Sequence, residues 1–286
     1  MASLRQIRGR IKSVASSKQI MRAMQLVSAS KLKRAQDRLL QARTVMEFLD
    51  GMLQRILAAT TAPEHPLCAV REEGHSALVL FTSDAGLCGS YNANLIQLAE
   101  AHLRRDAAKT THVIFIGKRA HRYFTKRGLT PLASYLELAG RPNAAKIEAI
   151  GLELMRHFLE GRVASIDLLY SPFRSSASCR PTILRWLPIS LQTQDARHKT
   201  QDEYIFEPSA AHVFNELLPQ WALATFQLIT LEALTSEHSA RMIAMKNATD
   251  NAQELLDALT LQRNKIRQAV ITKELSEIVG TVEALK

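Results

Sequence analysis

The stretch SEHSARMIAMKNATDN, residues 236–251, lies within a C-terminal arm, residues 221–286, that decides the fold. The arm contains no proline, and its only glycine is Gly280, so nothing in it breaks a helix. One continuous helix over the arm would be roughly 100 Å long, which exceeds the width of a compact domain of this size. The sequence therefore predicts a rod that its own chain cannot cover completely.

Composition is typical of a folded, water-soluble protein. Of the 286 residues 47% are hydrophobic and 22% are charged, which is ordinary for a globular chain. No apolar run approaches the roughly 20 residues of a membrane-spanning helix, and the N-terminus lacks the pattern of a secretory signal. Cys68, Cys88 and Cys179 are odd in number and form no C-x-x-C pair, which favours buried free thiols over disulfides or a zinc site. We expect an intracellular protein, at most peripheral to a membrane.

The net charge of +10 is concentrated near the N-terminus. Residues 1–44 carry eleven cations and a single acid, Asp37, so the rest of the chain is neutral overall. The cations are Arg5, Arg8, Arg10, Lys12, Lys18, Arg22, Lys31, Lys33, Arg34, Arg38 and Arg43. Because an ordinary solvated surface mixes both signs, this bias predicts an acidic partner, either nucleic acid or acidic protein loops.

The same N-terminal region predicts a long helix over residues 1–62. Ser3 and Gln6 fit a capping box at its start, and Pro63 and Pro66 end it. Apolar and small residues recur at the 3,4 spacing of a coiled-coil seam: Leu4, Ile7, Ile11, Val14, Met21, Leu32, Ala35, Leu39, Ala42, Met46, Leu49, Leu53 and Ile56. Lys18, Gln25 and Ser28 interrupt the seam, so we expect the middle of the helix to pack less tightly or to face a different partner.

The middle of the chain, residues 76–207, predicts an α/β domain. Short apolar, β-prone runs at residues 77–82, 112–117 and 165–170 alternate with helical stretches at residues 92–105, 118–126 and 143–161. This alternation indicates a mainly parallel sheet with helices on its faces. Residues 182–191 lie outside the alternation and are expected to pair as a hairpin partner at the edge of the sheet.

A second long helix is expected over residues 209–286, with Pro219 either kinking it or starting a fresh helix. Its seam runs through Leu231, Thr235, His238, Met242, Met245, Thr249, Ala252, Leu256, Leu259, Ile266 and Val270, after which the phase slips by one residue. Because the two ends of an inserted domain are usually close, we expect the terminal helices to pair antiparallel. The predicted fold is thus an α/β domain inserted between the two halves of a long antiparallel coiled coil.

The turn TSDAGLCGSYN, residues 82–92, follows a predicted strand and precedes a predicted helix. Phosphate often binds at this place in α/β folds, but the turn is not G-x-G-x-x-G, and the chain has no P-loop motif. We favour a structural turn, with a ligand site as the alternative. Cys88 has no histidine nearby in sequence to activate it, and the nine histidines show no metal-binding spacing.

Three classes of function remain open at this point. A nucleic-acid-binding coiled coil would use the arginines on phosphates, although the basic stretch has no aromatic residue before Phe48 for base stacking. An α/β enzyme would need a catalytic constellation that we do not find. A mechanical or interaction subunit, in which the coiled coil is the working part, needs neither feature.

Ordered blocks along the chain resemble the gamma subunit of the F-type ATP synthase, its central rotor shaft. The resemblance covers essentially the whole chain and rests on residues 7–14, 20–27, 31–36, 83–94, 236–251 and 261–280. In that family the terminal helices form an antiparallel coiled coil inside a ring of three alpha and three beta subunits. The α/β domain lies beside the epsilon subunit and the membrane c-ring. Ion flow turns the c-ring and the asymmetric shaft, which drives each beta subunit in turn through its conformations so that ATP is made or hydrolysed.

The resemblance implies a subunit that makes no bonds itself, has no catalytic residue, cofactor or metal, and binds no nucleic acid. Met1 leads almost directly into the first helix, which favours a complex on the cytoplasmic side of a bacterial plasma membrane over an organellar precursor. Met24 resembles the part of the shaft that faces the acidic lever loops of beta, and Arg8 and Lys12 share that basic surface. Family positions that hydrogen-bond to other beta loops correspond to Arg241, Arg267, Gln268, Thr272 and Glu274.

Two features depart from the family pattern. Ala85 stands where the family typically has a basic residue before Gly86, which removes the side chain for any ion pair from that position. The chain also lacks a cysteine pair of the chloroplast type, so switching by thiol oxidation is not expected.

Overall fold

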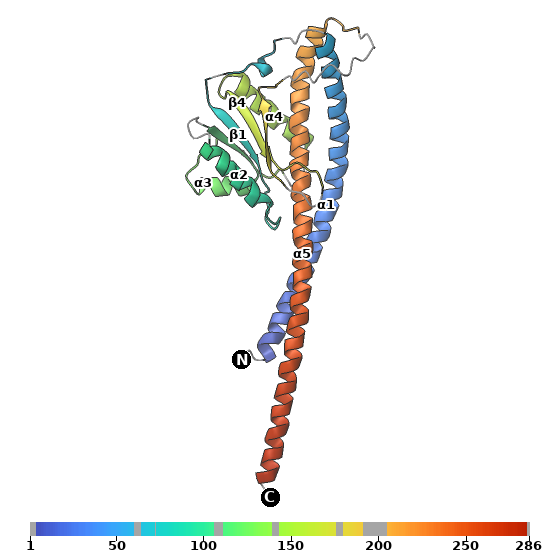
Figure 1. Cartoon of the computed structure of the whole chain (residues 1–286), viewed down its shortest axis with the longest axis vertical. Coiled ribbons are helices and arrows are strands. Elements are labelled where there is room, and N and C mark those ends of the chain that lie inside the picture. The colour runs from blue at the N-terminus through green and yellow to red at the C-terminus, as the bar shows by residue number, and fades with distance from the viewer. Residues whose placement is uncertain are drawn as a thin grey trace. The chain divides into compact units, whose positions relative to one another are not determined.

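A computed structural model describes residues 4–59, 64–71, 73–105, 111–138, 143–175, 180–190 and 205–284. The chain divides into two compact units, one formed by Ser30–Ala240 and the other by Met1–Ala29 with Arg241–Lys286. Two long helices, α1 (Leu4–Ala59) and α5 (Ala210–Ala284), contribute residues to both units (Figure 1). The predicted domain boundaries at residues 62, 76, 207 and 209 stay predictions.

The unit Ser30–Ala240 is built on a five-stranded sheet in the order β3-β2-β1-β4-β5. Its strands are β1 (Ser76–Phe81), β2 (Thr111–Ile116), β3 (Ala133–Tyr135), β4 (Ser165–Tyr170) and β5 (Thr182–Leu187). β1 pairs parallel with both β2 and β4, and β2 pairs parallel with β3. β5 pairs antiparallel with β4 at the edge. The predicted parallel sheet and its edge partner are therefore confirmed, whereas β3 is an additional strand that the sequence pattern does not predict.

Each face of this sheet buries a different set of helices. Leu78 and Leu80 of β1 point into a core with α2 (Tyr91–Arg105) and α3 (Lys118–Thr125). Val79, between them, points to the opposite core, which α4 (Ala144–Leu159) shares with α1 and α5. Figure 1 shows the same arrangement, with α2 and α3 on one side of the sheet and α4 and α5 on the other. The alternation follows from the pleat, which sends successive side chains to opposite faces.

Within this unit α1 and α5 run antiparallel. Asp50 accepts a hydrogen bond from the Trp221 indole at 2.6 Å, and Arg43 pairs with Glu232 at 2.7 Å, so positions advance along α1 as they recede along α5. Five residues of the seam predicted for α1 are buried here, which are Leu32, Leu39, Met46, Leu53 and Ile56, and Leu49 is half-buried. The predicted antiparallel pairing of the terminal helices is confirmed.

The start of α5 resolves the alternative left open for Pro219. The helix begins at Ala210, where the Ser209 hydroxyl accepts a hydrogen bond from the amide of His212 at 3.2 Å and caps the first turn. Pro219 lies inside the helix, which continues through it. A fresh helix starting at Pro219 is therefore wrong.

A substitution of Phe226 in α5 tests the packing of the core between α5 and the sheet. Its ring is 1% exposed and contacts Phe81 and Trp186, with ring centroids 6.0 and 5.2 Å away. We expect Phe226→Ala to lower the free energy of unfolding by about 3–5 kcal/mol, because the cavity cannot refill. Urea denaturation of the full-length chain measures this change. Phe48→Ala, at a 64% exposed ring, is the matched control and should cost about 0.5 kcal/mol or less. Equal losses in the two variants would contradict the packing.

Candidate functional site

The turn between β1 and α2 is held by its own polar groups. The amide of Ser83 donates to Asn92 Oδ1 at 3.0 Å, and Asn92 Nδ2 donates to Cys88 Sγ at 3.0 Å. Asp84 Oδ1 accepts from the amides of Lys118 and Glu137, each at 3.1 Å, which ties the turn to α3 and to the segment after β3. Because these groups are satisfied within the fold, the contacts support the structural interpretation of the turn.

Gly117, at the start of α3, shows how closely this turn packs. Its φ angle is +103°, and a Cβ atom placed there would lie 2.0 Å from the carbonyl oxygen of Thr82. Only glycine fits such a contact without moving the backbone. The close approach brings α3 beside the turn, where the amide of Ala120 donates to the Thr82 hydroxyl at 3.1 Å.

The basic surface predicted from the sequence lies on α1. In the unit that contains residues 4–29, the side chains of Arg8 and Lys12 are exposed and lie one helical turn apart. Met24 is half-buried, and Lys18 donates a hydrogen bond to Gln253 of α5. Ser28, one of the residues that interrupt the seam, is buried and donates to the Met24 carbonyl at 2.7 Å. Polar residues in the middle of α1 therefore form hydrogen bonds at positions where a regular coiled-coil seam would have apolar side chains.

Further along α5, burial stops at a defined point. Met245, Thr249, Ala252 and Leu259 are buried at seam positions, and Ile266 is half-buried. From Arg267 to Thr281 every residue is exposed. This exposed segment includes several large apolar side chains, which are Val270, Ile271, Leu275, Ile278 and Val279. Exposed apolar residues in such a concentration make this segment a candidate surface for binding a partner.

The eight predicted contact residues all lie in the unit formed by Met1–Ala29 and Arg241–Lys286. Arg267, Gln268, Thr272 and Glu274 occupy the exposed segment of α5, and none of their side chains is buried. Arg241 differs, because it is only 8% exposed and has partners within the chain. Its predicted contact with a beta subunit stays a prediction.

Metal-binding and membrane-spanning features are both absent from the part of the chain that the structure describes. No cluster of three or more histidine, cysteine, aspartate or glutamate side chains there could hold a metal ion. Across the same residues, no helix combines the length and the apolarity that crossing a membrane requires.

A family model described as ATP synthase matches residues 3–285. An ATP synthase gamma chain from Desulforamulus reducens is 40% identical over 286 residues, covering 100% of both chains. The chain belongs to the ATP synthase gamma chain family. A gamma chain from Pelotomaculum thermopropionicum is 39% identical over 286 residues, and one from Anaeromyxobacter sp. strain Fw109-5 is 40% identical over 291 residues, each with complete coverage of both chains.

The fold of this gamma chain family member is also found in solved rotors. The rotor of the Euglena gracilis mitochondrial ATP synthase matches with a TM-score of 0.66, covering 94% of this chain and 98% of that chain, at 19% identity. The central stalk of the Tetrahymena thermophila mitochondrial enzyme matches with a TM-score of 0.58, covering 80% and 99% respectively. At this identity the likeness establishes the fold. None of these findings supports the nucleic-acid-binding alternative.

A substitution of Asn92 tests whether its hydrogen bonds stabilise the turn between β1 and α2 of the gamma chain. We expect Asn92→Ala to lower the free energy of unfolding by about 1–3 kcal/mol, because it leaves the amide of buried Ser83 without its acceptor. Thermal and urea unfolding of the full-length chain give the change. Asn94→Ala removes only an exposed 3.3 Å bond to Ser90 and serves as the control, with an expected cost of about 0.5 kcal/mol or less. A neutral Asn92→Ala variant would count against the structural interpretation.

Proposed function

We propose that this chain is the central-stalk gamma subunit of an F-type ATP synthase, and that its exposed helical surfaces transmit rotation to the catalytic subunits. The observation that carries the proposal is the segment Arg267–Thr281 of α5, where every residue is exposed and large apolar side chains are concentrated. A lone helix gains nothing from exposing these side chains to water. A surrounding ring of subunits would cover them.

The proposed partners are three alpha and three beta subunits, the epsilon subunit and the membrane c-ring. Arg8, Lys12 and Met24 would face acidic loops of beta, and Arg267, Gln268, Thr272 and Glu274 would meet other beta loops. The exposure of these side chains is compatible with such contacts, apart from half-buried Met24. Arg241, which is buried, would have to contact beta through the little of its side chain that remains accessible.

The proposed mechanism requires a shaft whose contacts change as it turns. Two different helices present different chemistry, cationic on α1 and a mixture of large apolar and polar side chains on the end of α5, so rotation would offer each beta subunit a changing surface. A changing contact can bias an element that has two stable conformations, which is the physical requirement for allosteric coupling. Exposed ion pairs contribute only about 0.2–1 kcal/mol each, so such contacts form and break readily.

In this proposal the chain makes and breaks no bonds itself, and ATP chemistry belongs to the beta subunits. The complex would lie on the cytoplasmic side of a bacterial plasma membrane, with this subunit peripheral to the bilayer. The bacterial sources of the similar gamma chains support that location.

Removal of residues 275–286 tests the shaft directly. We expect this truncation to lower ATP synthesis in membrane vesicles strongly, because it deletes Leu275, Ile278 and Val279 from the exposed segment. Cys88→Ala, which changes a buried thiol in the turn, should lower the rate much less. The amount of assembled complex is measured in the same vesicles. Equal synthesis rates in the two variants would contradict the proposal.

The basic surface of α1 has a separate test. We expect the double variant Arg8→Gln, Lys12→Gln to weaken binding of the chain to an alpha–beta assembly by roughly two- to thirtyfold, the sum of two exposed ion pairs. The loss should shrink at high salt, which screens exposed charges. Lys146→Gln with Arg180→Gln removes the same charge from exposed positions elsewhere and is the matched control. Equal weakening in both double variants would show that only net charge matters.

A further inference from the structure

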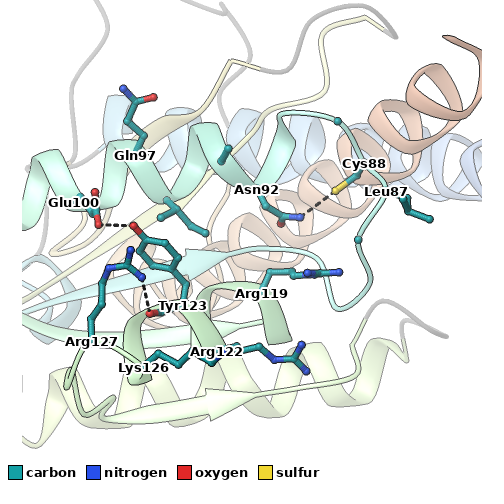
Figure 2. A pocket seen from close by; sticks show the side chains of 14 residues that line it. Leu87, Cys88, Asn92, Gln97, Glu100, Arg119, Arg122, Tyr123, Lys126 and Arg127 are labelled. Carbon is teal, nitrogen blue, oxygen red and sulfur yellow. Dashed lines mark hydrogen bonds between the residues drawn. The ribbon is translucent and has the colours of Figure 1, made fainter. Parts of the chain in front are cut away.

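A pocket of about 640 Å³ lies between α2 and α3, in the unit Ser30–Ala240. Residues of α2 form one wall and residues of α3 the other, and turn residues 86–89 contribute one end (Figure 2). The volume falls within the roughly 300–1,000 Å³ of small-molecule sites. None of the residues that line it belongs to the proposed beta-contact set, so binding of a ligand in this pocket would be independent of the rotor function.

Positive charge predominates in this pocket. Its lining contains four cations, Arg119, Arg122, Lys126 and Arg127, and one carboxylate, Glu100. The carboxylate is already engaged, since the Tyr123 hydroxyl donates to it at 2.8 Å and Arg104 lies 3.8 Å from its other oxygen. This hydrogen bond raises the pKa of Tyr123 above its ordinary value. The pocket therefore has an excess of cations over acids.

Three of these cations are available to a ligand. Arg127 is held over the Tyr123 ring, with its guanidinium carbon 3.6 Å from the ring centroid. Arg119, Arg122 and Lys126 are exposed, and among the described residues they form no ion pair. Their 3,4 spacing places them on one face of α3 and its C-terminal cap. In Figure 2 Arg119 and Arg122 extend toward the same side as the turn that carries Leu87 and Cys88.

The turn contributes space and apolar surface. A Cβ atom added at Gly86 would lie 2.2 Å from a guanidinium nitrogen of Arg119, so the absent side chain is what admits this group. Leu87, which is 60% exposed, and half-buried Ile96 add apolar surface to the lining. The pocket thus combines a row of cations with an apolar wall.

We propose that this pocket binds a small molecule that carries a chain of phosphate groups, held by Arg119, Arg122 and Lys126. Guanidinium groups bind phosphate through paired hydrogen bonds, and a lysine adds a point charge. The helix rises roughly 10 Å between positions 119 and 126, so a chain of phosphates reaches all three cations, whereas a single phosphate does not. An acidic peptide fits less well, because the turn closes one end of the space that an extended chain would follow.

Nucleotides and inorganic polyphosphate both carry a chain of phosphate groups, and binding experiments distinguish the two. Isothermal titration calorimetry measures the binding of tripolyphosphate, ADP and sulfate to the full-length chain at equal ionic strength. We expect tripolyphosphate or ADP to bind and sulfate not to bind. Tighter binding of ADP identifies a nucleotide, whose base would lie on Leu87 and Ile96, and tighter binding of tripolyphosphate identifies an inorganic chain. Binding of neither above the level of sulfate overturns the proposal, as does tighter binding of a hexaglutamate peptide.

A pair of double variants locates the binding. Arg122→Gln with Lys126→Gln should weaken the binding of the better phosphate probe by about tenfold or more, the loss of one or more charge-assisted contacts. Lys146→Gln with Arg180→Gln removes the same charge from exposed positions outside the pocket and should change binding by less than about twofold. Urea unfolding confirms that both variants are folded. Equal weakening in the two would assign the binding to net charge and sink the proposal.

Discussion

One apolar face of α5 is buried along only part of the helix. This burial separates the apolar side chains that the chain covers by itself from those that only a partner could cover. Phe214 and Phe226 are buried in the core that α5 shares with the sheet, and Met245, Ala252 and Leu259 are buried further along the helix. From Arg267 to Thr281 the same kind of residue is exposed. Since apolar burial is worth about 25 cal/mol per Å², an unburied row of this kind is stable only because the hydrogen bonds within the helix and the buried part upstream hold it. The exposed end is thus the place where binding can still gain free energy.

The charged surface of α1 and the exposed apolar side chains of α5 would contribute differently to the proposed rotation. Exposed cations such as Arg8 and Lys12 would attract the proposed acidic loops over a distance and hold them weakly. Contacts of apolar residues such as Leu275 are not directional, so they would tolerate sliding against the proposed ring of partners. Arg241 belongs to neither class, because it is buried and already has partners within the chain. A partner would therefore reach only the small exposed part of its side chain.

The long-range pattern of the fold could be predicted from the sequence, and several local features could not. The seam at Leu39, Met46 and Leu53 follows from 3,4 spacing, and the strands follow from β-branched and apolar runs. β3 was missed because its three residues are only half-buried and carry no alternation. The ends of the predicted helix at residues 60–62 and of the predicted edge strands at residue 191 lie outside the described residues. The location of the charge was readable from the sequence, but the burial of Arg241 depends on tertiary contacts that spacing does not encode.

The α2–α3 pocket shows why a motif search alone misjudges the turn beside it. A phosphate loop binds through free backbone amides, but the amides of Ser83 and Lys118 already donate to Asn92 and Asp84. The turn is therefore structural, as its contacts indicate. Its role at the pocket is indirect: it seats the guanidinium of Arg119 against Gly86, at the end of a row that continues with Arg122. An anion bound here would be recognised by side chains on α3. The spacing of these residues alone does not indicate a binding site, because α2 and the turn form the other walls of the pocket.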